Sequence, residues 1–375
     1  MEKLARSLGP GARLPSVREL CSSLKISLAT LSTALRSLEA KGVIVRRHGS
    51  GIYVTSRVAI PRVAILASAT QFLVGGSPVW GLLVGELLKG FREKGFEASF
   101  YLAQPADEAA KTFLIPPEFE LALGQGRVDG IVTVGMDENS VEYLMEAGLS
   151  PVSFAGPGSI NCRMDVAALA GELAGSLVGE GRKSAMVVGC HHPSMYESVK
   201  AELESAGLEV WPSREGIWAE RSLTDRMATP FMHVGQEFAG EFLGLVERGD
   251  APDALFIMDD IFAHGFLMLW ANGPGRDSVA LACLTNKELH MFDGWGIGLG
   301  LMEVSVQLFT KAMVEAVAEG LAHPDADCGE RARAVAKRMG GAAAGVVEDA
   351  PGRYTLLLKG RTQFVGRPTL KIGVT

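Results

Sequence analysis

The chain has 375 residues, a formal net charge of −7, and 47% hydrophobic and 21% charged residues. These proportions are typical of a globular protein with room for two or three compact units, and they exclude a disordered or fibrous chain. No apolar run reaches the roughly eighteen residues that a membrane-spanning helix needs, and no signal-peptide core is present, so we expect a cytoplasmic protein. The five cysteines are scattered without a CxxC pair, which favours reduced thiols over disulfides or zinc.

Two short helices are predicted near the N-terminus. Ser16 and Glu19 form a capping box, in which the serine hydroxyl and the glutamate three residues later satisfy amides at a helix start. This pattern predicts a helix over residues 17–24. Ser27 is a second N-cap, and leucines at helical spacing follow it, so a second helix is predicted over residues 28–40.

Two β-prone runs follow these helices. Residues 43–47 and 52–54 flank a glycine-rich tip at residues 48–51, which is typical of a hairpin. Two helices and a hairpin in this order predict a winged helix-turn-helix in residues 1–56. This segment has nine Lys or Arg and three Glu, hence +6, while the whole chain carries −7 and the remainder therefore −13. A basic module on an acidic chain favours phosphate binding.

The same segment resembles the DNA-binding head of the GntR family of bacterial transcription regulators. The resemblance rests on motifs that occur in order: Arg13-Leu-Pro-Ser16, Arg18-Glu-Leu20, Ile26-Ser27, Leu38-Glu39 and Arg47-His-Gly-Ser-Gly51. It implies DNA contacts from residues of the helices and of the wing. We expect these contacts at Arg13, Ser16, Arg18, Ser27, Thr30, Arg36, Arg47, His48 and Gly49. Leu28 and Ser32 replace arginines that are frequent in better-known members, so the base readout should differ.

After a short linker at residues 57–61, strands and helices alternate through residues 62–375. Repeated β-α units predict an α/β fold with doubly wound parallel sheets, and the length requires two lobes. The expected strands are 62–68, 97–102, 129–135, 151–155, 184–189, 209–211, 254–258, 279–283 and 354–358. The expected helices are 79–94, 118–125, 138–147, 166–178, 194–206, 234–248, 262–271, 303–320 and 331–337.

This second part resembles the effector domain of the lactose repressor, which has the fold of type I periplasmic sugar-binding proteins. The signs are Asp129-Gly-Ile-Val, the helix after Asp165, and a strand, acidic pair and Ala-x-Gly helix between Asp253 and Gly265. A GntR head on such a sensor is similar to the arabinose-responsive regulators. The resemblance implies a small-molecule effector, which we expect to be a sugar.

The ligand-facing positions that the resemblance implies are Trp80, Trp218, Asp259, Asp260 and Asn286. A sugar needs an aromatic platform and a few fixed polar groups. Each tryptophan is equally consistent with core packing, and one of the two aspartates can cap the following helix. Met195 stands about where the family has a pocket arginine, which weakens the sugar assignment.

Two glycine-rich stretches have no recognisable chemistry. Residues 294–300 lack the GxGxxG register and the Gly-Lys-Ser/Thr ending of phosphate-binding loops, which favours a close backbone approach or a loop. Residues 340–345 are interpreted as small-residue filler between a helix and a strand. His191 and His192 have no neighbouring metal ligands in the sequence, so no metal and no cofactor is expected. The sequence contains no catalytic constellation.

The sequence therefore predicts a transcription regulator that binds double-stranded operator DNA as a homodimer and responds to a small molecule. Two alternatives stay open. The effector can be another metabolite, such as a purine or an amino-acid derivative. The second part can also be an enzyme, as in regulators that carry a pyridoxal-phosphate aminotransferase domain, but no lysine lies in an evident cofactor context.

Overall fold

The structure is a computed structural model that describes residues 1, 4–5, 8–40, 42–56, 60–72, 77–106, 112–212, 231–273, 275, 277–295 and 297–365. The chain divides into two compact units, residues 1–63 with 91–98, and residues 64–90 with 99–375. No helix in the described ranges is long and apolar enough to cross a membrane.

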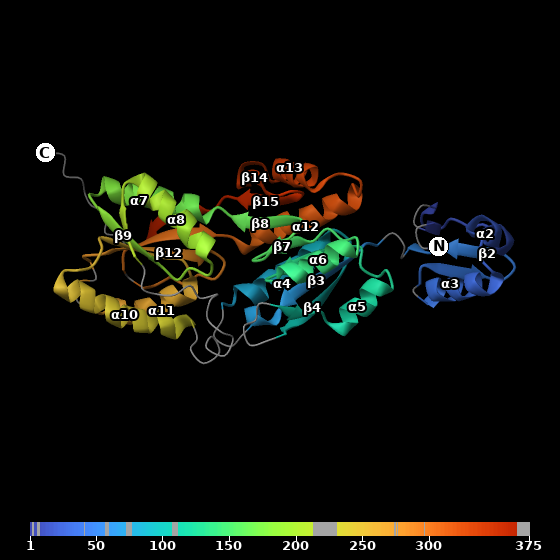
Figure 1. Cartoon of the computed structure of the whole chain (residues 1–375), viewed down its shortest axis with the longest axis horizontal. Coiled ribbons are helices and arrows are strands. Elements are labelled where there is room, and N and C mark those ends of the chain that lie inside the picture. The colour runs from blue at the N-terminus through green and yellow to red at the C-terminus, as the bar shows by residue number, and fades with distance from the viewer. Residues whose placement is uncertain are drawn as a thin grey trace. The chain divides into compact units, whose positions relative to one another are not determined.

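The N-terminal head contains the two predicted helices and the predicted hairpin (Figure 1). Helix α2 (Val17–Leu24) and helix α3 (Leu28–Ala40) precede β1 (Ile44–Arg47) and β2 (Gly51–Val54), which pair antiparallel. Leucines on one face of α3 are buried because they close a small core against α2 and the hairpin. That core consists of Ala5, Leu14, Leu20, Leu31, Leu35, Leu38, Val43, Ile44 and Val54.

The α/β part contains two sheets. The first has the strand order β14 (Ala343–Ala350), β15 (Arg353–Leu358), β8 (Ile160–Met164), β7 (Val152–Phe154), β6 (Gly130–Val134), β3 (Arg62–Ser68), β4 (Glu97–Pro105), β5 (Phe113–Leu114). The second has the order β10 (Glu209–Trp211), β9 (Ser184–Val188), β11 (Ala254–Ile257), β12 (Ala280–Asn286), β13 (Leu299–Val304), β16 (Arg361–Val365). Strands β9 to β13 pair in parallel, and β16 runs antiparallel to β13 at the edge.

Helices cover both faces of each sheet. The helices of the first lobe are α4 (Val79–Glu93), α5 (Pro117–Gly124), α6 (Glu138–Glu146), α12 (Val306–Ala322) and α13 (Cys328–Met339). Those of the second are α7 (Val166–Gly179), α8 (Pro193–Ala206), α10 (Phe231–Arg248) and α11 (Asp260–Trp270). In the second lobe, α7 and α8 lie on one face and α10 and α11 on the other (Figure 1).

The chain passes between the sheets after β8, after β13 and after β15, within the described residues. Each lobe is therefore built from segments that are far apart in sequence. This connectivity confirms the predicted two-lobed, doubly wound α/β architecture.

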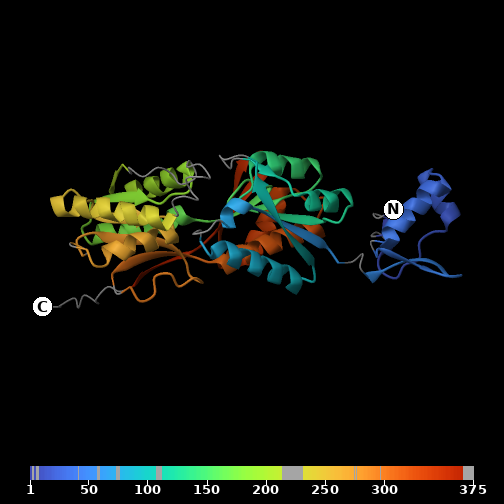
Figure 2. The ribbon, with the colours of Figure 1, turned by 90° about the horizontal axis from the view of Figure 1, so that it is seen from below.

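Helices α10 and α11 lie side by side in close contact (Figure 2). Glycines make this approach possible. A Cβ at Gly235 would lie 2.1 Å from the carbonyl oxygen of Phe262, and a Cβ at Gly265 would lie 1.9 Å from that of Met232. Only residues without a side chain fit at these two crossing points.

Two sequence predictions were wrong in this part, and some strands were not predicted. The helix predicted from Glu303 begins at Val306, because residues 299–304 form β13, buried between β12 and β16. The glycine-rich stretch before Glu303 was interpreted as a loop, so no strand was predicted there. Gly300 lies inside that strand, where a Cβ would meet Leu173 and Phe364 at 3.2 Å. Residues 340–345 were interpreted as filler, but Ala343 begins the edge strand β14, which continues to Ala350. Strands β8 and β16 had no counterpart among the predictions.

Candidate DNA-binding and effector sites

The start of α2 is fixed by the predicted capping box. The backbone N–H of Ser16 donates to Glu19 Oε2 at 2.7 Å, and the N–H of Glu19 donates to Ser16 Oγ at 3.3 Å. The bond from the Ser16 backbone, followed by that from its hydroxyl, holds the pKa of the Glu19 carboxyl below its usual value. Arg18 is exposed on the first turn of this helix. Ser16 therefore positions the helix that presents Arg18.

The start of α3 is also capped. The backbone N–H of Thr30 donates to Ser27 Oγ at 3.2 Å, and the two hydroxyl oxygens lie 2.9 Å apart. Further along the same helix, Arg36 Nη2 donates to Thr33 Oγ1 at 3.4 Å. Ser27 thus fixes the first turn of α3, and Arg36 lies two turns later.

The two arginines of the wing contact side chains of the hairpin and of α3. The Arg47 guanidinium lies 4.8 Å from the centre of the Tyr53 ring, and the Tyr53 hydroxyl is 2.8 Å from Ser50 Oγ. The guanidinium of Arg46 pairs with Glu39 of α3 at 3.1 Å. Sequence reasoning did not single out Tyr53, since an aromatic residue in a strand usually indicates packing alone.

All nine predicted DNA contacts are exposed on the head: Arg13, Ser16, Arg18, Ser27, Thr30, Arg36, Arg47, His48 and Gly49. Gly49 adopts a left-handed backbone (φ +69°) at the wing tip. The guanidinium of Arg13 lies against Gly51, where an added Cβ would be 2.7 Å from Nε. The arrangement is a basic, exposed surface of two capped helices and a wing.

In the second lobe, the polar residues Asp259, Asp260 and Asn286 follow or end neighbouring strands. β11 and β12 are parallel and in register, with Ile257 opposite Cys283, so residues at their carboxyl ends meet. Asn286 Nδ2 donates to Asp260 Oδ2 at 3.4 Å. The structure therefore brings these three predicted ligand residues together.

Two residues that sequence reasoning did not assign to the site complete this cluster. His191, just beyond β9, has Nε2 2.7 Å from Asp259 Oδ2. Ser77, just before α4, donates from Oγ to Asp260 Oδ1 at 3.4 Å. The order β9, β11, β12 in the sheet would have predicted the place of His191, but that order is not visible in the sequence. We call Ser77, His191, Asp259, Asp260 and Asn286 the polar cluster.

The two aspartates differ in their partners. Asp259 caps α11, because the backbone N–H of Phe262 donates to its Oδ1 at 2.8 Å. This confirms that one of the pair acts as a helix cap. Asp260 is only 4% exposed, and its bonds from Asn286 and Ser77 are both long. Burial, and after it the charge of Asp259, raises the pKa of Asp260 to about 6.

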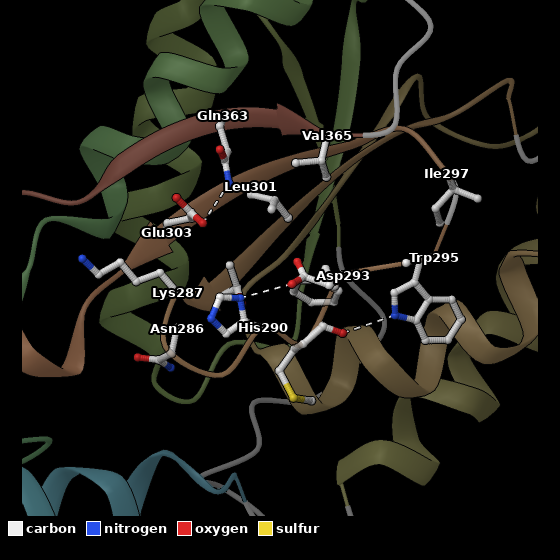
Figure 3. A pocket seen from close by; sticks show the side chains of 14 residues that line it. Asn286, Lys287, His290, Asp293, Trp295, Ile297, Leu301, Glu303, Gln363 and Val365 are labelled. Atoms are coloured by element: carbon white, nitrogen blue, oxygen red, sulfur yellow. Dashed lines mark hydrogen bonds and ion pairs between the residues drawn. The ribbon is translucent and has the colours of Figure 1, made fainter.

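A cavity of about 270 Å³ has one residue of the polar cluster, Asn286, in its wall (Figure 3). Most of its lining residues belong to the loop that joins β12 to β13. Its lining is Thr285, Asn286, Lys287, His290, Met291, Phe292, Asp293, Gly294, Trp295, Ile297, Leu301, Glu303, Gln363 and Val365.

Several side chains of the cavity wall are held by hydrogen bonds (Figure 3). Trp295 Nε1 donates to the carbonyl oxygen of Met291 at 3.2 Å, and Gln363 Nε2 donates to Glu303 Oε1 at 2.8 Å. Arg361 forms an ion pair with the other oxygen of Glu303. Trp295 is thus an aromatic wall next to fixed polar groups. The sequence offered no signal for it beyond the glycine-rich stretch that surrounds it.

Of the two tryptophans predicted as aromatic platforms, the structure describes only Trp80. Trp80, on the first turn of α4, lies 5.9 Å from Phe154, which stacks on Phe309 at 4.9 Å between ring centres. Trp80 is half-buried in this aromatic group of the first lobe. Trp218 lies outside the described residues.

Metal and thiol chemistry find no support in the described residues. They contain no group of three or more His, Cys, Asp or Glu placed to hold a metal ion. All five cysteines lie in the described ranges and are free, and burial raises the pKa of Cys162, Cys190 and Cys283 to about 12. Such thiols are poor nucleophiles at neutral pH.

A winged helix-turn-helix joined to a two-lobed α/β domain defines a class of transcription regulators. Residues 3–54 match the family model of the bacterial regulatory proteins of the gntR family. The HTH-type transcriptional regulator Rv1152 of Mycobacterium tuberculosis is 33% identical over 85 residues, which are 23% of this chain and 69% of that protein. The chain belongs to the gntR family of bacterial regulators.

Solved structures share the fold of most of the chain. The complex of the transcriptional regulator CelR with cellobiose has a TM-score of 0.54 at 14% identity, over 93% of this chain and 98% of that one. The Cra dual regulator of Pseudomonas putida with fructose 1-phosphate has a TM-score of 0.51 at 14% identity, over 80% and 97%. A LacI-family regulatory protein of Chloroflexus aggregans has a TM-score of 0.52 at 10% identity, over 80% and 96%. The α/β part has the fold of LacI-family regulators.

Proposed function

We propose that this transcription regulator binds a small molecule, in the first instance a sugar, at the polar cluster and the adjoining cavity, and that the ligand changes its binding to operator DNA. The proposal assigns DNA binding to a head of residues 1–56, a linker to residues 57–61, and effector binding and dimerisation to residues 62–375. It assigns no catalytic step and a cytoplasmic location.

The observation that carries the proposal is the polar cluster at the carboxyl ends of β9, β11 and β12. Open α/β sheets bind ligands at this edge. Asp260 and Asn286 offer acceptors to hydroxyl groups, since Asn286 Oδ1 is buried and has no hydrogen-bond partner among the described residues. The half-buried Trp295 and the apolar residues beside it suit the less polar face of a sugar ring. Two regulators of similar fold are described with cellobiose and with fructose 1-phosphate, which favours a carbohydrate.

The proposed mechanism is a population shift between two arrangements of the lobes. The Ser77–Asp260 bond joins a segment between β3 and α4 to the start of α11, and a ligand that bonds to Asp260 would replace it. A ligand that prefers one arrangement of the lobes shifts the equilibrium toward it. In a homodimer, this change would alter the separation of two heads that bind the two halves of a symmetric operator.

Thermal unfolding of the full-length protein with pentoses, hexoses, uronic acids and deoxysugars tests the proposal. A sugar present at a hundred times its dissociation constant should stabilise the native state by about 2.7 kcal/mol. Asn286→Ala should abolish the shift, whereas Asn272→Ala, which removes an exposed amide in the turn after α11, should leave it unchanged. No shift with any sugar would favour a non-sugar metabolite. A shift that Asn286→Ala leaves intact would place the ligand elsewhere.

A further inference from the structure

The first turn of α3 presents an apolar side chain to solvent. Leu28 is 63% exposed, more than any other large hydrophobic residue among those described. The three leucines that anchor this helix in the head core, Leu31, Leu35 and Leu38, are at most 4% exposed. Leu28 thus adds nothing comparable to the core of the head, and its side chain is available for contact with a bound partner.

The same turns of α3 carry no side chain that can read guanine or adenine by a pair of hydrogen bonds. Residues 28–35 are Leu-Ala-Thr-Leu-Ser-Thr-Ala-Leu. Arginine and lysine read guanine, and asparagine and glutamine read adenine. The first such residue in the helix is Arg36, eight residues after Leu28, which is about 12 Å along the axis.

Leu28 is the first residue of α3, at the end of the helix that reaches base edges in this class of motif. The second helix of a helix-turn-helix lies in the major groove, with its N-terminal residues against the bases. The thymine C5-methyl is the apolar group that bases present in that groove. The +6 charge of residues 1–56 supplies the attraction to phosphates, and residues 28–35 carry no acid that would oppose it.

We propose that Leu28 reads thymine methyl groups in the major groove, so that each operator half-site carries thymine beneath the first turn of α3. Ala29 and Thr33, both exposed, extend this apolar and hydroxyl surface. The inference rests on the proposed operator binding and adds the base that the head selects.

The test starts from operators selected by the full-length protein from a pool of random duplexes. Each thymine of a selected duplex is then replaced by deoxyuridine, which removes the methyl and keeps the base pair. In each half-site, we expect one or two thymines at which a single replacement weakens binding about fourfold. This is the value expected for ~0.8 kcal/mol of lost apolar contact. Leu28→Ala should remove the sensitivity of binding to deoxyuridine.

A matched variant controls for a general loss of apolar surface. Leu24→Ala removes a leucine that is 40% exposed at the end of α2, and it should keep the sensitivity. Leu28→Arg should move the selected base at that position from thymine to guanine.

Five outcomes separate the hypotheses. Sensitivity to deoxyuridine that Leu28→Ala removes supports the inference. Sensitivity that Leu28→Ala retains, or no sensitivity at any position, overturns it. A change of oligomeric state in Leu28→Ala without any change in DNA binding would assign the residue to a protein contact and also overturns it. Failure to enrich any sequence from the pool would instead refute operator binding itself.

Discussion

The buried carboxylate of Asp260 should cost the ligand-free protein stability at neutral pH. Its pKa rises from the ordinary 3.8 to about 6, first because of burial and then because of the charge of Asp259. The folded state therefore binds this proton more tightly than the unfolded state does. The free energy of unfolding then falls as the pH rises from about 4 to about 6, and the loss is complete above 6. Two pH units correspond to about 3 kcal/mol.

Asp260→Asn replaces the carboxylate with a neutral group of the same shape. The variant should raise the free energy of unfolding of the ligand-free protein by up to about 3 kcal/mol at pH 7.5, and by much less at pH 4.5. Urea unfolding of the full-length chain, followed by circular dichroism at both pH values, measures the difference between variant and parent. A ligand must be absent, because bonds to Asp260 would offset the cost of its charge.

Asp253→Asn is the matched control from the same lobe. Two backbone N–H groups, of Lys183 at 2.7 Å and of Ser184 at 3.1 Å, donate to Asp253 Oδ2 and hold the pKa of this carboxyl below its usual value. Its charge therefore stabilises the folded state, and the substitution should lower the free energy of unfolding at pH 7.5. If Asp260→Asn is destabilising to the same extent at both pH values, the reasoning about its buried charge is wrong.

Two further substitutions test the head and the second lobe. Arg18→Ala should weaken operator binding at least tenfold in a gel-shift assay while the effector's dissociation constant stays nearly unchanged; equal losses of both would count against separate modules, and Arg92→Ala, also exposed, is the control. Gly265→Ala should lower the free energy of unfolding by about 2 kcal/mol or more, because its Cβ would meet a backbone oxygen, whereas Gly240→Ala, with open space around it, should raise stability by up to about 1 kcal/mol. Chemical unfolding checks both glycine variants, and equal effects would show that α10 and α11 can move apart at little cost.

The sequence alone determined the head almost residue by residue. The capping box at Ser16, the cap at Ser27 and the leucine spacing are local signals, because each depends on residues three or four positions apart. The predicted helices at residues 17–24 and 28–40 agree with α2 and α3 for that reason. The β-α alternation likewise predicted the class of the second part, since buried parallel strands appear as continuous apolar runs.

Only the tertiary structure decided the rest. Strand β13 was missed because its apolar, glycine-containing sequence has no local signal for a strand. Its place between β12 and β16, where Gly300 leaves room for Leu173, explains this sequence. His191 reaches Asp259 because β9 and β11 are neighbours in the sheet, although 68 residues separate the two side chains. Which aspartate caps a helix and which is buried with a raised pKa also follows from neighbours distant in sequence. The burial of a side chain and its electrostatic surroundings depend on all residues near it in space. Local sequence patterns do not show which residues these are.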